Sequence, residues 1–391
     1  MRYAILLVPL LALFALACNG GGEAQPTATA EPATTVTPAA EASPTREPTS
    51  GTLVFLRGPD LWIASPDGES MPPRAITSGS LGTRYVGFVR GPDGEIDLYY
   101  ARQLSEERVE NNRRLADYGL YRATMDEGTP EELLRFSSSA FRAFSHPFVG
   151  SVSPDGEHVV YTEMESLLLL DLASGESSRL LESGPCVLDS GSDCDGYGNP
   201  QWSPDGEVVM VSKFLHGERA RTILLNPFES PIDATEAGYG IGRPAWSPDG
   251  ERLCSWGSAG DSPANLDVHS ISTGETTDIL AQLLMPTPKG DYLGNVFGCA
   301  WSADGRLAVA YAEDIVSPAR IAILDSAFNV IVESDTIEDY TTVVAWLPDG
   351  SGVVFNRQDP EAGPLPPRLF DLQRGIIDLP FEASLVVGVI P

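Results

Sequence analysis

A five-residue motif, Trp-Ser-Pro-Asp-Gly, recurs in whole or in part six times along this chain and constrains the fold more than any other feature. Successive copies are separated by roughly 44 to 62 residues, which is the spacing expected for the blades of a β-propeller. Alternating apolar residues follow each copy, a pattern that indicates a half-buried strand. The turn aspartates of the six copies are Asp93, Asp155, Asp205, Asp249, Asp304 and Asp349.

The motif has the chemistry of a tight turn between two strands. Pro presets φ at the first corner, Asp hydrogen-bonds the neighbouring backbone, and Gly adopts the left-handed conformation that ends the turn. Two more strand-like segments follow in most units, the weakest being residues 230–238. Four antiparallel strands per unit, repeated radially, form a propeller. We therefore predict an all-β fold, a seven-bladed β-propeller with four-stranded blades, over residues 51–391.

The two ends of the repeat region complete each other. Residues 52–57 read as the second strand of a blade that has no first strand, and residues 384–391 read as a first strand with no second. Closing one blade with strands from both ends removes an open sheet edge. We therefore predict six complete blades and one composite first blade that is closed by the C-terminal strand.

A polar insertion interrupts one unit at residues 103–117, QLSEERVENNRRLAD. Its mixed charges favour a solvated excursion, with one or two turns of helix expected. The whole chain carries 55 acidic and 25 basic residues, a formal net charge of −30. A field of that sign repels nucleic acid and anionic lipid, so we predict no nucleic-acid partner. We expect a monomer.

The N-terminal segment is predicted to direct export. Residues 1–17 combine one Arg, an apolar run and small residues before Cys18, the pattern of a signal peptide. The "ALAC" stretch resembles a bacterial lipoprotein signal, which implies a lipidated Cys18 and membrane contact through that anchor only; the alternative is an ordinary secreted protein. Residues 18–50 are rich in Pro, Thr and Ala and predict a disordered tether.

The repeats resemble the TolB-like propellers of the WD-repeat-like class, which carry Trp-Ser-Pro-Asp-Gly at the inner hairpin of each blade. The resemblance covers residues 51–391; Trp is present in four copies, and Ala303 replaces Pro once. It implies a periplasmic or surface scaffold that binds proteins or peptides. Together with the N-terminal segment, this predicts a lipid-anchored scaffold at the bacterial cell envelope, on the extracytoplasmic side. The motif tryptophans are expected to pack between blades: Trp202, Trp246, Trp301 and Trp346.

Signals for catalysis are sparse. The turn aspartates recur in every copy, which favours a structural role over acid–base chemistry. The four histidines have no ligand-pair spacing, and neither a nucleophile elbow nor a zinc-protease motif occurs: His146, His158, His216 and His269. We therefore predict a non-enzyme that needs no cofactor. Two alternatives are an envelope lyase or hydrolase with its site at the channel mouth, and a structural envelope protein.

One acidic loop, residues 182–201, joins two blades. Asp189, Asp193 and Asp195 with Gly196 are weak Ca²⁺ candidates, because no bidentate Glu follows at the expected distance. Cys186 and Cys194 flank these acids and are a candidate disulfide in an exported protein. Two further cysteines lie in neighbouring units, and the sequence leaves open whether they are paired or buried thiols: Cys254 and Cys299.

We expect the ligand on the propeller face that carries the long, dissimilar loops, because the short motif turns on the opposite face are nearly identical. Several aromatic side chains lie on or beside these loops and are candidate anchors, although they are equally consistent with capping the core. The predicted ligand-binding residues are Phe141, Phe144, Asp193, Asp195, Tyr197, Tyr292 and Phe297.

Overall fold

The computed structural model describes most of the chain from residue 51 onward. The described residues are 51–110, 113–126, 129–141, 150–163, 166–183, 196–214, 220–229, 232, 234–239, 244–257, 264–284, 294–313, 317–359 and 362–391. Residues 1–50, which hold the predicted signal peptide, Cys18 and the tether, lie outside this set. Within the described residues, no helix is long and apolar enough to span a membrane.

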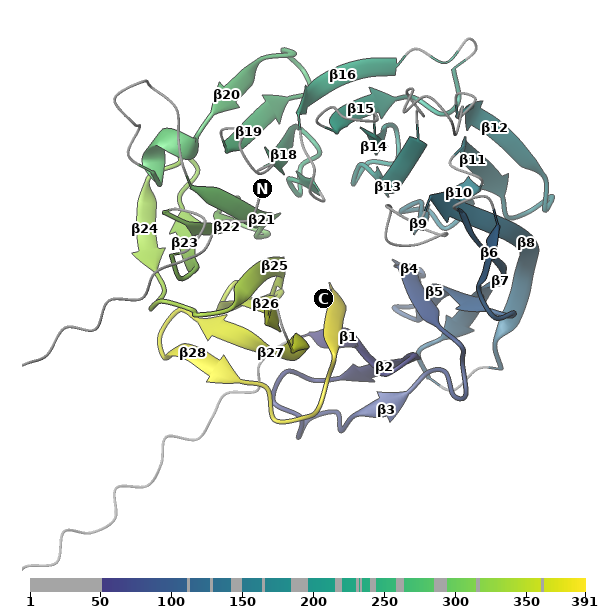
Figure 1. The fold of residues 1–391 in the computed structure, drawn as a ribbon, viewed down its shortest axis with the longest axis horizontal. Coiled ribbons are helices and arrows are strands. Elements are labelled where there is room, and N and C mark those ends of the chain that lie inside the picture. The colour runs from purple at the N-terminus through teal and green to yellow at the C-terminus, as the bar shows by residue number, and fades with distance from the viewer. Residues whose placement is uncertain are drawn as a thin grey trace, which may run out of the picture. The chain divides into compact units, whose positions relative to one another are not determined.

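Seven antiparallel sheets stand around a central axis as the blades of a β-propeller (Figure 1). Blade 1 contains β29 (Leu385–Ile390), β1 (Thr52–Arg57), β2 (Asp60–Ala64) and β3 (Arg74–Ala75). Blade 2 contains β4 (Thr83–Arg90), β5 (Ile96–Gln103), β7 (Arg113–Thr124), β6 (Arg108–Glu110) and β8 (Glu131–Phe141). Blade 3 contains β9 (Gly150–Val152), β10 (His158–Glu163), β11 (Ser166–Asp171) and β12 (Ser177–Leu181).

The remaining blades follow the same order from the axis outward. Blade 4 contains β13 (Gly196–Trp202), β14 (Val209–Phe214), β15 (Arg221–Leu225) and β16 (Ala234–Tyr239). Blade 5 contains β17 (Ala245–Trp246), β18 (Arg252–Gly257), β19 (Asn265–Ser270) and β20 (Thr276–Asp278), followed by the short 3₁₀ helix η1 (Leu280–Gln282). Blade 6 contains β21 (Asn295–Trp301), β22 (Leu307–Ala312), β23 (Arg320–Leu324) and β24 (Val330–Glu333). Blade 7 contains β25 (Tyr340–Trp346), β26 (Gly352–Asp359), β27 (Gly363–Asp371) and β28 (Gly375–Asp378).

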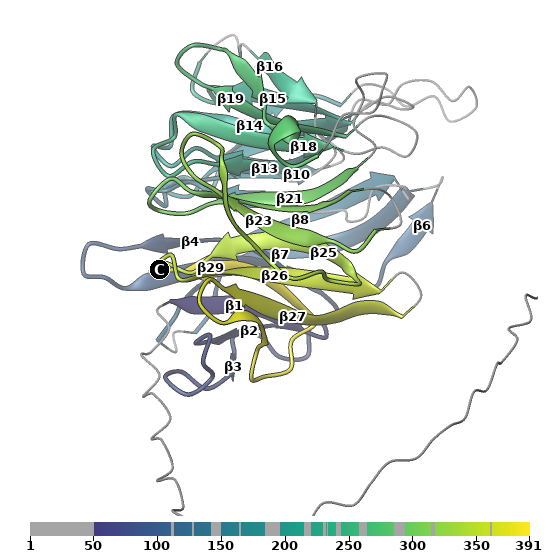
Figure 2. The ribbon, with the colours of Figure 1, turned by 90° about the vertical axis from the view of Figure 1, so that its left-hand side faces the viewer.

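The composite blade is confirmed. The C-terminal strand β29 pairs with β1 in an antiparallel register that matches Leu53 with Val389. Figure 2 shows β29 lying beside β1, far from it in sequence. Two β29 side chains, Val386 and Ile390, are each only 1% exposed. Asn356 of blade 7 also holds this strand, because its side-chain amide donates to the Val386 carbonyl and accepts from the Val386 N–H, both at 2.8 Å.

The motif turns fold as the sequence predicts. In blade 4 the Ser203 hydroxyl donates to Asp205, whose carboxylate also accepts from the backbone N–H of Glu207. Gly206 has a φ of 77°, a left-handed conformation that favours glycine. The hydrogen bond from Ser203 is the main reason why the pKa of Asp205 lies below its usual value. These aspartates therefore stabilise turns, as their recurrence suggested.

The motif tryptophans tie neighbouring blades together. Each of three indole N–H groups donates to the preceding blade, to the carbonyl of the residue just before that blade's own motif. The bonds are Trp202 to Ser151 at 3.1 Å, Trp301 to Ala245 at 3.1 Å and Trp346 to Ala300 at 2.9 Å. An arginine that follows the motif turn of the preceding blade lies over the indole ring in two cases. The guanidinium of Arg252 in blade 5 lies 4.5 Å from the Trp301 ring centre, and that of Arg306 in blade 6 lies 4.6 Å from the Trp346 ring centre. The predicted packing role is thus confirmed for these three rings.

One local expectation differs from the structure, and a weakly indicated strand is confirmed. The described part of residues 103–117 contains no helix; β6 pairs with the start of β7, matching Arg108 with Leu115. Pairing with β7, which itself lies between β5 and β8, outweighs the helix-forming tendency of this polar stretch. In blade 4, a fourth strand does form from the weak segment, because Ala234–Tyr239 pairs with β15.

The two cysteines whose pairing the sequence left open form a disulfide. The Cys254–Cys299 bond joins β18 to β21, and so links blade 5 to blade 6.

Candidate functional site

A cavity of about 620 Å³ lies at the centre of the ring. It receives residues from the inner strand of every blade, namely β29, β4, β9, β13, β17, β21 and β25. Its volume falls in the range of pockets that bind small molecules in proteins. We refer to it as the channel cavity. Its lining includes Phe88, Ser151, Gln201, Trp202, Trp246, Trp256, Trp301, Thr342, Val343, Asn356 and Val386.

The chemistry of the channel cavity is apolar and uncharged. None of its described lining residues is an Asp, Glu, His, Lys, Arg or Tyr, so none can serve as a general acid or base. Valines and alanines from β25 and β29 supply aliphatic surface, and four indole rings supply flat aromatic surface. The polar groups are side-chain hydroxyls and amides, such as Ser151, Gln201 and Thr342.

Two tryptophans in this wall have indole N–H groups that are buried and have no hydrogen-bond partner, Trp246 and Trp256. Trp246 is the motif tryptophan of blade 5, and by the pattern of the other blades its acceptor is the Gln201 carbonyl of blade 4. Trp256 lies on the second strand, β18. It reaches the cavity because the inner strand β17 is two residues long and pairs only with Leu253 and Cys254 among the described residues.

The boundary between blades 4 and 5 also differs from the others in packing. Its hydrophobic cluster contains four buried residues: Met210, Leu224, Ala237 and Leu253. Val208 and Trp246 both pack against this cluster. Val208 follows the motif turn of blade 4, as Arg252 and Arg306 follow the turns of blades 5 and 6, but it carries no charge. Two buried serine hydroxyls close to these residues in sequence have no hydrogen-bond partner: Ser212, two residues after Met210, and Ser255, two residues after Leu253. We call this boundary the blade 4–5 seam.

A smaller cavity of about 340 Å³ adjoins the channel cavity beside the motif turns of blades 3 and 4. The two cavities share Phe88, Ser151 and Trp202. The smaller one adds Arg90 from the end of β4 and Pro154 from the blade 3 turn. The channel cavity is therefore flanked, on the side of the motif turns, by a space that includes one cationic side chain.

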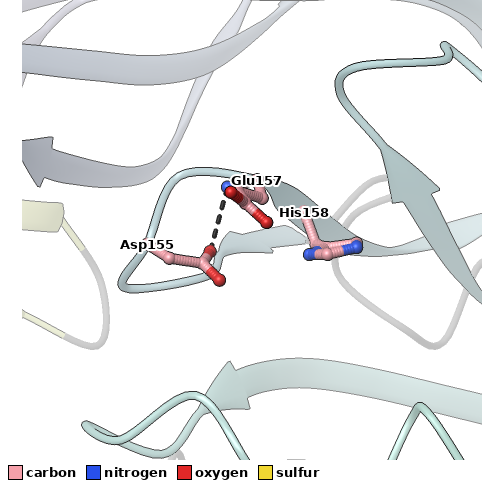
Figure 3. A group of neighbouring side chains, drawn as sticks. All are labelled: Asp155, Glu157 and His158. Carbon is pink, nitrogen blue, oxygen red and sulfur yellow. Dashed lines mark hydrogen bonds between the residues drawn. The ribbon is translucent and has the colours of Figure 1, made fainter.

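Three potential metal ligands lie together on the blade 3 turn: Asp155, Glu157 and His158 (Figure 3). Their ligand atoms lie within 4.8 Å of one another, and both carboxylates are exposed. Histidine and carboxylates are ligand types that Zn²⁺ accepts. The equivalent turns of blades 4 and 5 carry the same Asp and Glu but have Val208 or Arg252 in the position of the histidine.

Packing accounts for His158. Its ring lies 5.1 Å from that of Phe228 and 6.4 Å from that of Trp202, measured between centres. It thus covers the motif tryptophan of the next blade, as Arg252 and Arg306 do. Its Nε2 also lies 3.8 Å from an Asp171 carboxylate oxygen. The sequence had indicated no ligand pair for this histidine; the close spacing of Asp155, Glu157 and His158 was the available signal.

The aromatic anchors predicted from the sequence lie in separate blades. Tyr197 is on β13, half-buried against a core cluster that includes Val160 and Val211. Phe297 is half-buried at an irregularity in β21, with its ring 5.9 Å from that of Tyr340 in an edge-on arrangement. Both rings contact core residues. The backbone of Phe141 ends β8, and the other predicted residues lie outside the described set: Phe144, Cys186, Asp189, Asp193, Cys194, Asp195 and Tyr292.

No protein-family model matches this chain, and no curated protein does. Among solved structures, a prolyl endopeptidase matches with a TM-score of 0.52 at 12% identity, covering 87% of this chain and 50% of that one. A putative 6-phosphogluconolactonase from Bacteroides fragilis matches with a TM-score of 0.50 at 11% identity, covering 89% of this chain and 100% of that one. TolB from Acinetobacter baumannii matches more loosely, with a TM-score of 0.45 at 17% identity, covering 75% of this chain and 66% of that one. At these identities the first two likenesses show the propeller fold.

Proposed function

We propose that this protein is a lipid-anchored, extracytoplasmic propeller that acts as a protein- or peptide-binding scaffold at the bacterial cell envelope. The observation that carries the proposal is the channel cavity, about 620 Å³ in volume, walled by apolar and uncharged polar groups. A rigid ring of seven sheets holds this wall in place, so a ligand group that enters it meets a largely preformed surface.

Two features support the location outside the cytoplasm. Residues 1–17 have the pattern of a signal peptide and Cys18 follows small residues, as in a lipoprotein. The Cys254–Cys299 disulfide also fits an oxidising compartment, because structural disulfides are rare in the bacterial cytoplasm. Both features are consistent with export and neither depends on the structural likenesses.

The composition of the cavity wall favours a scaffold over an enzyme. A lyase or hydrolase acting in the channel needs groups that exchange protons with the substrate, and the described lining residues supply none. A purely structural envelope protein has no need of a cavity of about 620 Å³ at its centre. Binding of an uncharged group uses both the apolar surface and the uncharged polar side chains of this wall.

A capture experiment with a blocked channel tests this function. The bait is the full chain with Cys18→Ser, so that it is handled without detergent. Ala345→Phe places a large ring at a half-buried position in the channel wall, and Val330→Phe makes the same kind of change on the outer strand β24, where Val330 is 39% exposed. We expect envelope proteins captured by the bait to be lost with Ala345→Phe and kept with Val330→Phe. Equal capture by both variants would exclude the channel as the binding site.

A further inference from the structure

The smaller cavity beside the motif turns of blades 3 and 4, about 340 Å³ in volume, forms an apolar groove next to the channel cavity. We call it the turn-face groove. Six of its nine lining residues are apolar: Phe88, Val89, Val152, Pro154, Trp202 and Pro204. Both prolines are exposed, and Phe88 and Val89 are half-buried. The apolar surface of this groove is therefore accessible to a partner molecule.

An exposed aromatic ring continues this apolar surface. Phe228, in the turn after β15, is 55% exposed, and its ring centre lies 6.0 Å from that of Trp202. Since Trp202 also lines the turn-face groove, the two apolar regions are contiguous. Contiguous exposed apolar surface with a polar rim is characteristic of interaction sites.

The rim of the turn-face groove is acidic. Pro154 and Pro204 line the groove, and each is followed by an aspartate and, two residues later, by a glutamate. These four side chains are exposed: Asp155, Glu157, Asp205 and Glu207. None of the four forms an ion pair with an Arg or Lys in the described part of the chain. Glu229, next to Phe228, is a further exposed acid.

Negative charge is not distributed evenly over the motif turns. A cation follows the turn in blades 5 and 6, namely Arg252 and Arg306, and Arg306 forms an ion pair of 2.9 Å with Asp304. Blades 3 and 4 have His158 and Val208 after the turn instead. The acidic side chains beside the turn-face groove thus lack the arginines that accompany the turns of blades 5 and 6.

An occupant of the turn-face groove must match both its apolar lining and its acidic rim. Arg90 is the one cation among the lining residues, and its guanidinium donates to the backbone carbonyl of Pro391. An anionic partner is repelled by the rim and by the net charge of −30. A segment that carries an apolar side chain between Lys or Arg residues is complementary to both features.

We propose that the turn-face groove docks a basic segment of a partner protein, with an apolar side chain in the groove and Lys or Arg side chains beside the turns of blades 3 and 4. The inference rests on the proposed function and names the chemistry of the partner and the surface that it contacts. Docking is then on the face of the motif turns, opposite to the face with long loops that the sequence favours.

The test removes two charges of the rim without changing the turns. Glu157→Gln and Glu207→Gln keep the backbone N–H groups that donate to the turn aspartates, at 2.9 Å in blade 3 (Figure 3) and at 3.0 Å in blade 4. Asp335→Asn with Glu338→Gln is the matched control. Both of these side chains are exposed, and they lie on the connection from β24 to β25, at the end of β25 away from its motif turn.

The probe is a peptide amide of sequence Lys-Lys-Phe-Lys-Lys with an N-terminal fluorophore, and its match has Gly in place of Phe. The protein is the full chain with Cys18→Ser, and the readout is fluorescence anisotropy at pH 7 and about 0.15 M salt. We expect saturable binding of the Phe peptide and weaker binding of the Gly peptide. The double rim variant is expected to weaken binding of the Phe peptide by about fivefold, the effect of two exposed charge pairs, and the control variant to leave it unchanged.

Three results would overturn the proposal. Equal binding of the Phe and Gly peptides shows that charge alone attracts them and that the groove is not used. Equal binding by the unchanged protein and the double rim variant places the peptide elsewhere. Self-association of the protein, measured by sedimentation and lost in the double rim variant, identifies a second copy of this chain as the occupant.

These outcomes are distinguishable from failure of the proposed function. Capture of envelope proteins that depends on the channel, together with no rim-dependent peptide binding, keeps the scaffold and rejects the basic segment. Rim-dependent peptide binding without channel-dependent capture keeps the docking groove and rejects the channel as the binding site.

Discussion

Removal of the C-terminal strand β29 is the sharpest test of how this ring is held closed. Deleting residues 384–391 takes away Val386 and Ile390, which are both 1% exposed. Each contributes about 1.5–3 kcal/mol of burial free energy. The deletion also leaves the Asn356 amide without the Val386 backbone groups that satisfy it, at a cost of about 1–3 kcal/mol. The combined loss is comparable with the roughly 5–15 kcal/mol by which whole domains are stable.

The assay is thermal unfolding of the full chain with Cys18→Ser, followed by circular dichroism, with and without the deletion. We expect the truncated chain to have no cooperative transition at or above 37 °C, because the lost free energy removes most of the net stability. Leu385→Ala is the control: it changes the same strand at a side chain that is 39% exposed and is expected to have little effect. A truncated protein that melts at the temperature of the full-length one would refute the composite blade as the closing element.

Four other perturbations have expected outcomes of their own. Asn356→Ala removes both bonds to Val386 while leaving β29 in place, and is expected to lower the unfolding free energy by about 1–3 kcal/mol in denaturant titrations. Cys18→Ser is expected to move the protein from the membrane to the soluble fraction, and retention in the membrane would contradict lipid anchoring. The pKa of Asp205 is lower in the folded protein than in the unfolded chain, where it is about 4. The free energy of unfolding is therefore expected to fall as the pH drops below about 4, toward the folded-state pKa of this carboxyl. Ser203→Ala removes the hydroxyl that lowers this pKa and is expected to shrink the acid-sensitive part of unfolding curves.

The architecture was predictable because its determinants are local and repeated. Each copy of the motif specifies a turn by residue type, and the spacing of copies specifies a blade. The composite blade followed from two incomplete units at the ends of the repeat region. The same reasoning misjudged residues 103–117, where the strand state of the segment depends on pairing between β6 and β7 and not on its own charge pattern.

The candidate site was less accessible from the sequence, for a physical reason. The channel cavity collects one or a few residues from each of seven inner strands that are far apart in the chain. No local spacing brings Gln201, Trp246 and Asn356 together; only closure of the ring does. The sequence instead directed attention to aromatic residues in long loops, and the two that the structure describes with their side chains, Tyr197 and Phe297, are half-buried against core residues.

The unpaired indole N–H of Trp246 sets the boundary between blades 4 and 5 apart from the other boundaries that carry a motif tryptophan. A propeller built from similar blades makes similar contacts at every boundary. A departure from the repeat costs stability, and such departures in proteins are typical of functional sites. Here the departure combines a two-residue inner strand, a valine in place of the cation that covers the next tryptophan, and two indole N–H groups without acceptors. The short strand, Val208 and Trp246 lie at the boundary between blades 4 and 5, whereas Trp256 packs against the cluster between blades 5 and 6. Both tryptophans are among the residues that line the central cavity. Fully satisfied motif tryptophans, such as Trp301 and Trp346, have no hydrogen-bonding capacity left for a ligand. Among the four boundaries that carry a motif tryptophan, the blade 4–5 seam is thus the one that lacks the internal hydrogen bond seen at the other three.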